Sequence, residues 1–238
     1  MFDDDEIEGI KYSKIVANTI NGHVFLNEEF FSIHGEGLHT GIPMYFVRLQ
    51  GCGVGCYFCD EKKTWAVSPM NRGLIDGDVL VTDIIKRAAL SGARWMCVTG
   101  GEPYEQPLEP LILGAKWMNM KTHVETSGEP GTWQDLGPSL DWMTLSPKDL
   151  FGKHHRQPDK QFIERADEIK CVVTKARDID YYMKNYSPRI TEKPLIFQPV
   201  DNDPEVARVI ASIIEGKGWS LDLPIRLMMQ QHKIAGLR

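Results

Sequence analysis

The sequence predicts an α/β protein whose parallel strands form an incomplete, open (β/α) barrel. Two observations lead to this fold class: apolar, strand-like runs alternate with helical segments, and the predicted helices are fewer than the predicted strands. Apolar strands separated by helices are typical of a parallel sheet that is covered on at least one face. A complete (β/α)₈ barrel needs about 250 residues, more than the 238 of this chain, so we expect the barrel to stay open.

Strands are expected where apolar and β-branched residues cluster between glycine, proline and polar residues. In chain order these runs are residues 44–50, 94–99, 122–126, 142–146, 168–174, 195–200 and 225–230. Helices are expected at residues 78–90, 108–119, 178–186 and 204–215, where apolar residues recur at helical spacing. Gly92 follows the first helix, and Gly216 and Gly218 follow the last, where glycine commonly ends a helix.

Composition and charge indicate one globular domain. With 42% hydrophobic and 25% charged residues, the chain can bury one sizeable core. The first residues are acidic, so we expect a poorly ordered N-terminal extension over residues 1–22 and a single domain over 23–238. The net charge of −6 argues against a nucleic-acid partner, because phosphate binding needs a basic face. No run is apolar enough for a signal segment or a bilayer span, which favours a cytoplasmic protein.

Three cysteines stand in the run that follows the first predicted strand: Cys52, Cys56 and Cys59, in Gly-Cys-Gly-Val-Gly-Cys-Tyr-Phe-Cys. Metal sites that only support a fold usually close with four protein ligands, whereas sites that do chemistry keep one position open. A four-iron cluster takes one thiolate per iron. Three thiolates would leave one iron free for a ligand, so the loop is a candidate reaction centre.

Other interpretations of the cysteines remain open. A zinc site completed by His34, His39 or Asp60 would use similar spacings. A disulfide framework is the weakest alternative, because the chain has five cysteines and no signal segment. Cys97 and Cys171 lie inside strand-like runs and are expected to be small, buried apolar residues without a chemical role.

Polar or glycine-rich runs follow five of the predicted strands. Besides the cysteine loop they are Thr99-Gly-Gly-Glu-Pro103, Glu125-Thr-Ser-Gly128, Ser146-Pro-Lys148 and Gln198-Pro199. The carboxyl ends of parallel strands meet at one edge of the sheet, and ligands bind there. The convergence of five such runs on this edge, with a thiol cluster among them, predicts a functional site.

These residues resemble a known family. The spacing Cys52-x₃-Cys56-x₂-Cys59, with Phe58 before the last cysteine and Gly-Gly-Glu-Pro at the next strand end, resembles the radical S-adenosylmethionine (SAM) enzymes. Within that superfamily the chain looks like the 7-carboxy-7-deazaguanine synthase family. The runs that carry this closer resemblance are Phe30-Phe-Ser-Ile-His-Gly-Glu-Gly37, Leu145-Ser-Pro-Lys148, Phe197-Gln-Pro199 and Gln230-Gln-His-Lys233. The resemblance extends from about residue 27 to the C-terminus, apart from residues 66–79.

The resemblance implies a reaction of 7-deazapurine (queuosine-type) biosynthesis. A [4Fe–4S] cluster would bind SAM at its free iron and supply the electron that releases a 5′-deoxyadenosyl radical. That radical would take hydrogen from 6-carboxy-5,6,7,8-tetrahydropterin, whose ring contraction with loss of ammonia gives 7-carboxy-7-deazaguanine. The protein would contribute orientation and electrostatics, and no catalytic side chain is implied beyond the cluster and SAM.

The resemblance also implies which residues bind the cofactors and which bind the substrate. On the cofactor side it implies Cys52, Cys56, Phe58, Cys59, Gly100, Gly101, Glu102, Ser127, Ser146, Pro147 and Lys148. On the substrate side it implies Ile33, His34, Gly35, Glu36, Arg48, Thr99, Gln198 and His232. Glu36 can accept hydrogen bonds from the paired N–H donors of a pterin ring, and Arg48 can bind a carboxylate through two N–H donors.

Two positions depart from the family's usual pattern. His34 stands where the family usually has glutamine, which introduces a group that can titrate near neutral pH. Glu61 stands where the family usually has a threonine that ligates Mg²⁺. Because glutamate is a harder and charged oxygen donor, we expect Glu61 to be a Mg²⁺ ligand.

Two other functions stay open at this stage. One is another radical SAM enzyme, such as a glycyl-radical activase, which would act on a protein. The other is a non-catalytic zinc or iron–sulfur protein. Glu36, Arg48 and the terminal His-Lys pair favour a small polar heterocycle. The implied partners are the pterin, an electron donor such as flavodoxin or ferredoxin, and a second copy of the chain in a homodimer.

Overall fold

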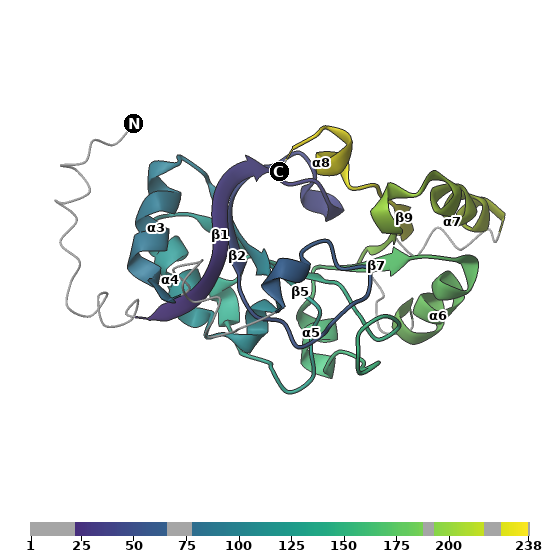
Figure 1. Cartoon of the computed structure of the whole chain (residues 1–238), viewed down its shortest axis with the longest axis horizontal. Coiled ribbons are helices and arrows are strands. Elements are labelled where there is room, and N and C mark those ends of the chain that lie inside the picture. Colours follow the sequence, from purple (N-terminus) through teal and green to yellow (C-terminus); the bar gives the residue numbers. More distant parts are fainter. Residues whose placement is uncertain (1–21, 66–77, 188–192, 217–224, 238) are drawn as a thin grey trace.

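The computed structural model describes residues 22–65, 78–187, 193–216 and 225–237 (Figure 1). Apart from residue 22, the predicted acidic extension over 1–22 lies outside the described residues. The division into an extension and one domain over 23–238 therefore stays a prediction.

The described residues form one nine-stranded sheet in the order β3-β1-β2-β4-β5-β6-β7-β8-β9. Its strands are β1 (His23–Ile33), β2 (Pro43–Leu49), β3 (Asp78–Leu80), β4 (Trp95–Gly100), β5 (Lys121–Thr126), β6 (Trp142–Leu145), β7 (Glu168–Val173), β8 (Leu195–Pro199) and β9 (Ile225–Leu227). From β2 to β9 each neighbouring pair is parallel, whereas β1 runs antiparallel to both β2 and β3. The end strands β3 and β9 are not neighbours, so the sheet is an open barrel, as predicted.

Helices cover the outer side of the curved sheet (Figure 1). They are α3 (Val81–Leu90), α4 (Glu109–Trp117), α5 (Lys160–Arg165), α6 (Ala176–Tyr186) and α7 (Pro204–Gly216), and the short α8 (Gln231–Ile234) lies at the opening of the barrel. Single 3₁₀ turns occur at Gly37–His39, Lys62–Thr64, Pro103–Glu105, Gly137–Ser139 and Val200–Asn202. In the described part of the chain, no helix has the length and apolar character needed to cross a membrane.

All seven predicted strands and all four predicted helices are present, but β1, β3, α5 and α8 were not predicted. Most of β1 is only partly buried, so its sequence lacks the continuous apolar run of the parallel strands. The predicted helix at 78–90 starts later than expected, because residues 78–80 pair with β1 as β3. The strand predicted at 225–230 ends at Leu227, beyond which Gln230 bonds to Asn202 instead of continuing the sheet.

The two faces of the sheet differ in polarity, because successive residues of a strand point to opposite sides. The outward face is apolar and packs with the helices in one buried core; its strand residues include Val47, Leu49, Val98, Val124 and Leu145. The inward face carries polar residues at the intervening positions, among them Arg48, Thr99, Glu125 and Lys170. The core that stabilises the barrel therefore lies outside it, and the interior is left for a site.

Candidate active site

The carboxyl ends of the parallel strands surround three adjoining cavities. One of about 180 Å³ is lined by the three loop cysteines, and we call it the cysteine cavity. A second of about 520 Å³, the larger cavity, shares Thr99 and Glu125 with it. A third of about 170 Å³, the bridging cavity, shares Cys56 and Cys59 with the first and Glu36 with the second. The shared residues show that the three cavities adjoin, and we treat them as one candidate site.

The cysteine cavity brings together most of the residues expected to bind cofactors. Besides the three cysteines, its lining includes Gly100, Gly101, Glu102, Ser127, Ser146 and Lys148. Burial raises the pKa of the Cys52 thiol to about 12 and also raises that of Cys56. Both are therefore protonated at neutral pH until a metal displaces the proton. The donor set of three thiols beside an open space fits an iron–sulfur cluster.

The Gly-Gly-Glu run is bonded to the base of the cysteine loop. Gly101 N–H donates to Leu49 O (2.9 Å) and Glu102 N–H to Gly51 O (2.8 Å). A Cβ atom on Gly101 would lie 1.8 Å from Gly51 O, so only glycine allows the two backbones to approach this closely. The first role of these glycines is thus to join β4 to the loop that carries the thiols.

The Glu102 carboxylate joins the ends of β4 and β5. It accepts from Thr126 Oγ1 (2.5 Å), from the backbone N–H of Ser127 (2.8 Å), from the Ser127 hydroxyl and from Tyr104 N–H (3.2 Å). Burial raises the pKa of Glu102, although these hydrogen bonds oppose the shift. The Ser127 hydroxyl donates its proton to Glu102, so its oxygen can only accept a hydrogen bond from a ligand.

Three other expected cofactor residues lie in different surroundings. The Lys148 ammonium donates to Ser146 O (2.7 Å) and to the Ser146 hydroxyl, and burial lowers the pKa of Lys148. Phe58 packs edge-to-face on Phe151 with ring centroids 5.0 Å apart, and it also lines the bridging cavity. Pro147 lines none of the three cavities as the described residues form them.

The larger cavity gathers seven of the eight residues expected on the substrate side. They are Ile33, His34, Gly35, Glu36, Arg48, Thr99 and His232. The eighth, Gln198, lies in the bridging cavity, and its Nε2 donates to Glu36 Oε2 (3.2 Å). Residues from β1, β2, β4, β8 and α8 thus meet at one place.

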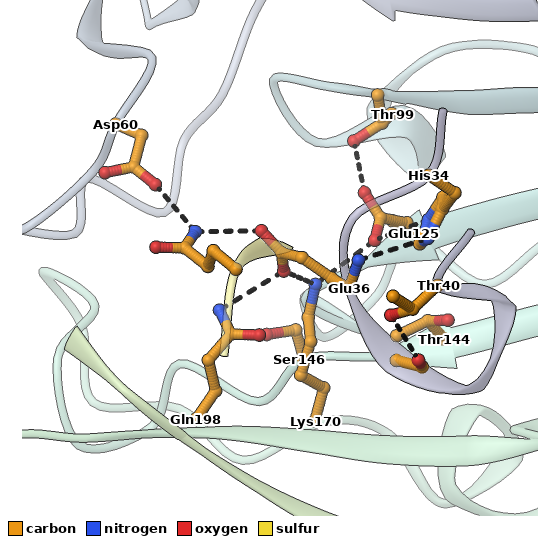
Figure 2. A network of polar contacts seen from close by, with 12 residues as sticks. His34, Glu36, Thr40, Asp60, Thr99, Glu125, Thr144, Ser146, Lys170 and Gln198 are labelled. Atoms are coloured by element: carbon orange, nitrogen blue, oxygen red, sulfur yellow. Dashed lines mark hydrogen bonds and ion pairs between the residues drawn. The ribbon is translucent and has the colours of Figure 1, made fainter. Parts of the chain in front are cut away.

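Lys170 stands at the centre of the polar network inside the barrel (Figure 2). Its ammonium forms ion pairs with Glu36 Oε2 and with Glu125 Oε1, the latter at 3.1 Å. Burial alone would raise the pKa of Glu36, but the Lys170 charge lowers it to about 2, and that of Glu125 is also held well below its usual range. Although burial disfavours its charge, the two carboxylates raise the pKa of Lys170. All three groups are therefore ionised at neutral pH.

Gln230 completes the surroundings of Glu36. Its Nε2 donates to Glu36 Oε1 (2.8 Å) and lies 3.3 Å from Asp60 Oδ2. Gln230 therefore joins the substrate-side network to Asp60, the residue after the last cysteine. Gln198 Oε1 is buried and has no hydrogen-bond partner among the described residues. A buried acceptor without a partner is costly, so Gln198 is suited to receive a donor from a ligand.

Sequence reasoning missed Lys170 and Gln230. Lys170 lies within the apolar run of β7, where a lysine gives no motif, although it lies two residues after Glu168 and so points to the same inner face. Gln230 was expected at the end of a strand, but it precedes α8. A charged residue within an otherwise apolar strand was the available signal for Lys170.

The C-terminal helix α8 packs directly against the loop that carries Glu36. Gln231 N–H donates to Gly35 O (2.8 Å). A Cβ atom on Gly35 would lie 2.3 Å from His232 Nδ1, so glycine is required for this contact. Burial lowers the pKa of His232. The helix thereby connects the loop after β1 with the segment after β9.

Arg48 and Glu61 lie together on the rim of the larger cavity. Arg48 Nε donates to Glu28 Oε1 (2.8 Å), and its Nη2 lies 3.8 Å from Glu61 Oε1. Lys63 Nζ lies 3.2 Å from Glu61 Oε2. Arg48 therefore keeps guanidinium donors facing the cavity, and Glu61 is neutralised by two cations.

The zinc alternative gains no support from His39. Its Nδ1 lies 3.2 Å from His123 Nδ1, and its ring packs against Trp95 and Trp142, away from the cysteine cavity. Among the described residues, the three ligands close enough for a single ion are His34, Cys97 and His123, and not the three loop cysteines. Cys97 and Cys171 are fully buried, as predicted.

Comparison with known proteins places the chain among enzymes of one kind. No family model matches it. It is 31% identical over 212 residues to 7-carboxy-7-deazaguanine synthase of Synechocystis, covering 89% of this chain and 92% of the relative. It is also 31% identical to the enzyme of that name from Escherichia coli K12, and the match covers 87% of this chain and 96% of the relative. The crystal structure of QueE from Escherichia coli matches with a TM-score of 0.72 and 30% identity, over 87% of this chain and 94% of that one.

Proposed function

This chain belongs to the 7-carboxy-7-deazaguanine synthase family, and from that premise we propose how its residues bind the cofactors and the substrate. The chain is a radical SAM lyase that forms 7-carboxy-7-deazaguanine from 6-carboxy-5,6,7,8-tetrahydropterin with loss of ammonia. The alternatives of a glycyl-radical activase and of a non-catalytic metal protein are thereby set aside. The observation that carries our assignment of residues is the joining of the larger cavity to the cysteine cavity through shared side chains.

We assign the cluster to Cys52, Cys56 and Cys59. When bound, the cluster supplies the electron that cleaves SAM and so generates the radical that starts the reaction. Lys148 lies between the cysteine cavity and the bridging cavity, and its ammonium suits the SAM carboxylate. Ser127 and Ser146 would offer hydroxyl oxygens to SAM from the same rim. Their support is their common place in the lining of the cysteine cavity.

We assign the pterin to the larger cavity. Glu36 is ionised and offers carboxylate oxygens to the paired N–H donors of the pterin ring. The unpartnered oxygen of Gln198 would accept a further ring donor. Arg48 would bind the substrate carboxylate with its remaining guanidinium donors. Thr99 and His232 would complete the polar lining.

Glu61 is our proposed Mg²⁺ ligand. Asp60 and Glu61 both line the larger cavity, and their hard oxygen donors fit Mg²⁺. Lys63, which now neutralises Glu61, is 54% exposed and can turn toward solvent. We expect thorough chelation to lower product formation, added Mg²⁺ to restore it, and a Glu61→Gln variant to need more Mg²⁺. Product formation that is unchanged by chelation would refute this assignment.

The decisive test of the function is anaerobic reconstitution of the iron–sulfur cluster, followed by incubation with SAM, a reductant and the carboxytetrahydropterin. We expect mass spectrometry to detect 7-carboxy-7-deazaguanine, together with ammonia release. Cleavage of SAM without a deazaguanine product would contradict the substrate and leave the radical SAM chemistry in place. Absence of both reactions in a fully reconstituted protein would contradict the enzyme assignment.

The remaining partners are also proposals. A one-electron donor such as flavodoxin or ferredoxin would serve the cluster, and its identity can be tested by replacing the chemical reductant in the same assay. A homodimer is supported by the exposed apolar side chains of Ile33, Ile234 and Leu237 around one hollow. Sedimentation of the purified chain tests it. A cytoplasmic location and the lack of a nucleic-acid partner stay predictions.

A further inference from the structure

The geometry assigns one tautomer to His34. Its Nδ1 accepts from the backbone N–H of Glu36 (3.3 Å), and its Nε2 lies 3.5 Å from Glu125 Oε1 (Figure 2). A ring nitrogen that accepts carries no proton, so in the neutral ring the proton is on Nε2 and points to the carboxylate. His34 is 3% exposed, so solvent does not compete for either nitrogen. The ring is neutral and protonated at Nε2.

Packing holds the His34 ring in this orientation. It stacks on Phe46 with centroids 5.8 Å apart and an interplanar angle of 15°, and it contacts His123 with centroids 4.9 Å apart. Turning the ring over would place carbon atoms where Nδ1 and Nε2 now lie. Both the Glu36 N–H and the Glu125 carboxylate would then lose a partner, which is costly for buried groups.

The imidazoles deeper in the barrel are neutral as well. Thr144 donates its proton to Glu168 (2.7 Å), so Thr144 accepts from Nε2 of His123 (2.8 Å). The Nδ1 of His123 must therefore accept, and the Nδ1 of His39 donates to it (3.2 Å). Burial lowers the pKa of His123, and burial is also the largest cause that lowers the pKa of His39, to about 4.

A metal ion is the competing explanation for this cluster. His34, Cys97 and His123 have ligand atoms within 4.8 Å of one another. Both nitrogens of His34 and both of His123 already have polar partners, so an ion would have to displace one on each ring. The observed contacts account for the cluster without an ion.

We propose that neutral His34 is a positioning residue that holds Glu36 and Glu125 in the orientation that the pterin requires. The four residues His34, Glu125, Lys170 and Glu36 form a closed ring of contacts, in which His34 bonds the Glu36 backbone and Lys170 bonds the Glu36 carboxylate. His34 thus acts on the substrate through both carboxylates. This inference rests on the proposed function, because it takes the larger cavity as the pterin site.

Two substitutions separate the role of the hydrogen bonds from that of the ring. In His34→Gln the carboxamide can accept from the Glu36 N–H and donate to Glu125, so kcat/KM at pH 8 should stay well above that of His34→Leu. In His34→Leu neither bond can form, and kcat/KM should fall about 10- to 100-fold, chiefly through a higher KM. A His39→Gln variant removes a buried imidazole that bonds neither carboxylate, so it should cost stability but leave KM unchanged. An equal fall in kcat/KM in His34→Gln and His34→Leu would overturn the proposal.

Nitrogen NMR tests the tautomer without an activity measurement. Two-bond ¹H–¹⁵N spectra of the holoenzyme at pH 8, assigned with His34→Gln, should show an unprotonated Nδ1 and a protonated Nε2. A protonated Nδ1 would overturn the inference. If the wild type forms no deazaguanine, the proposed function fails, whereas the NMR result still decides the tautomer on its own.

Discussion

Replacing Lys170 by methionine is expected to lower the free energy of unfolding by about 3–5 kcal/mol at pH 8, because it leaves two buried carboxylates without their shared cation. Glu36 and Glu125 both contact the Lys170 ammonium in the wild type. Product formation should fall about 100-fold or more, since Glu36 would no longer be held in place for the substrate. Chemical denaturation and the deazaguanine assay measure the two effects.

The effect on stability should depend on pH in a defined direction. In the wild type the pKa of Glu36 is about 2, below its ordinary value of 4.5. This carboxylate therefore stabilises the fold above pH 4.5, and the contribution is lost as the pH falls toward 2. Without Lys170, burial and the neighbouring carboxylate raise the pKa of at least one of the pair. The folded variant then holds an extra proton, and its stability falls as the pH rises through that raised pKa.

The difference in unfolding free energy between wild type and Lys170→Met should therefore be larger at pH 8 than at pH 5. Lys116→Met is the matched control, since Lys116 pairs with one carboxylate, Asp141, and is 37% exposed. Removing such a surface pair should cost about 1 kcal/mol or less. A loss for Lys170→Met that is the same at both pH values would show that the methionine disturbs packing and not charge.

The parallel part of the barrel was predictable from the sequence because each strand is buried on its outer face. Val47 and Val98 end the continuous apolar runs Met-Tyr-Phe-Val and Trp-Met-Cys-Val, which identify strands without knowledge of the fold. The partly buried β1 carries no such run, so its antiparallel pairing with β2 could not be predicted from periodicity. Its position depends on partners far along the chain.

The site was predictable to the extent that its residues stand at strand ends. The cysteines and the Gly-Gly-Glu run fall there, and the barrel brings them together. Lys170 and Gln230 do not, because one lies within β7 and the other in the turn before α8. Their importance arises from contacts with Glu36 across 134 and 194 residues of sequence separation. Long-range charge pairing of this kind leaves no local pattern.

Replacing Cys56 by alanine is expected to abolish the visible absorption of the reconstituted cluster, SAM cleavage and product formation together. Cys56 lines both the cysteine cavity and the bridging cavity, so it lies between the two halves of the site. The control is Cys171→Ala, because Cys171 is also a buried thiol but packs in the outer core. This variant should bind a normal amount of iron and lose about 1 kcal/mol of stability.

The size of the Cys56 effect follows from the number of ligands. Three thiolates leave one iron of the cluster free for SAM, whereas two thiolates leave a second iron without a protein ligand. No other cysteine can replace it, because Cys97 and Cys171 are fully buried within the barrel wall. Iron content, absorption and 5′-deoxyadenosine release should therefore fall together in Cys56→Ala, and all three should be retained in Cys171→Ala. A Cys56→Ala protein that still cleaves SAM would mean that another residue holds the cluster, and the assignment of the three loop thiols would then be wrong.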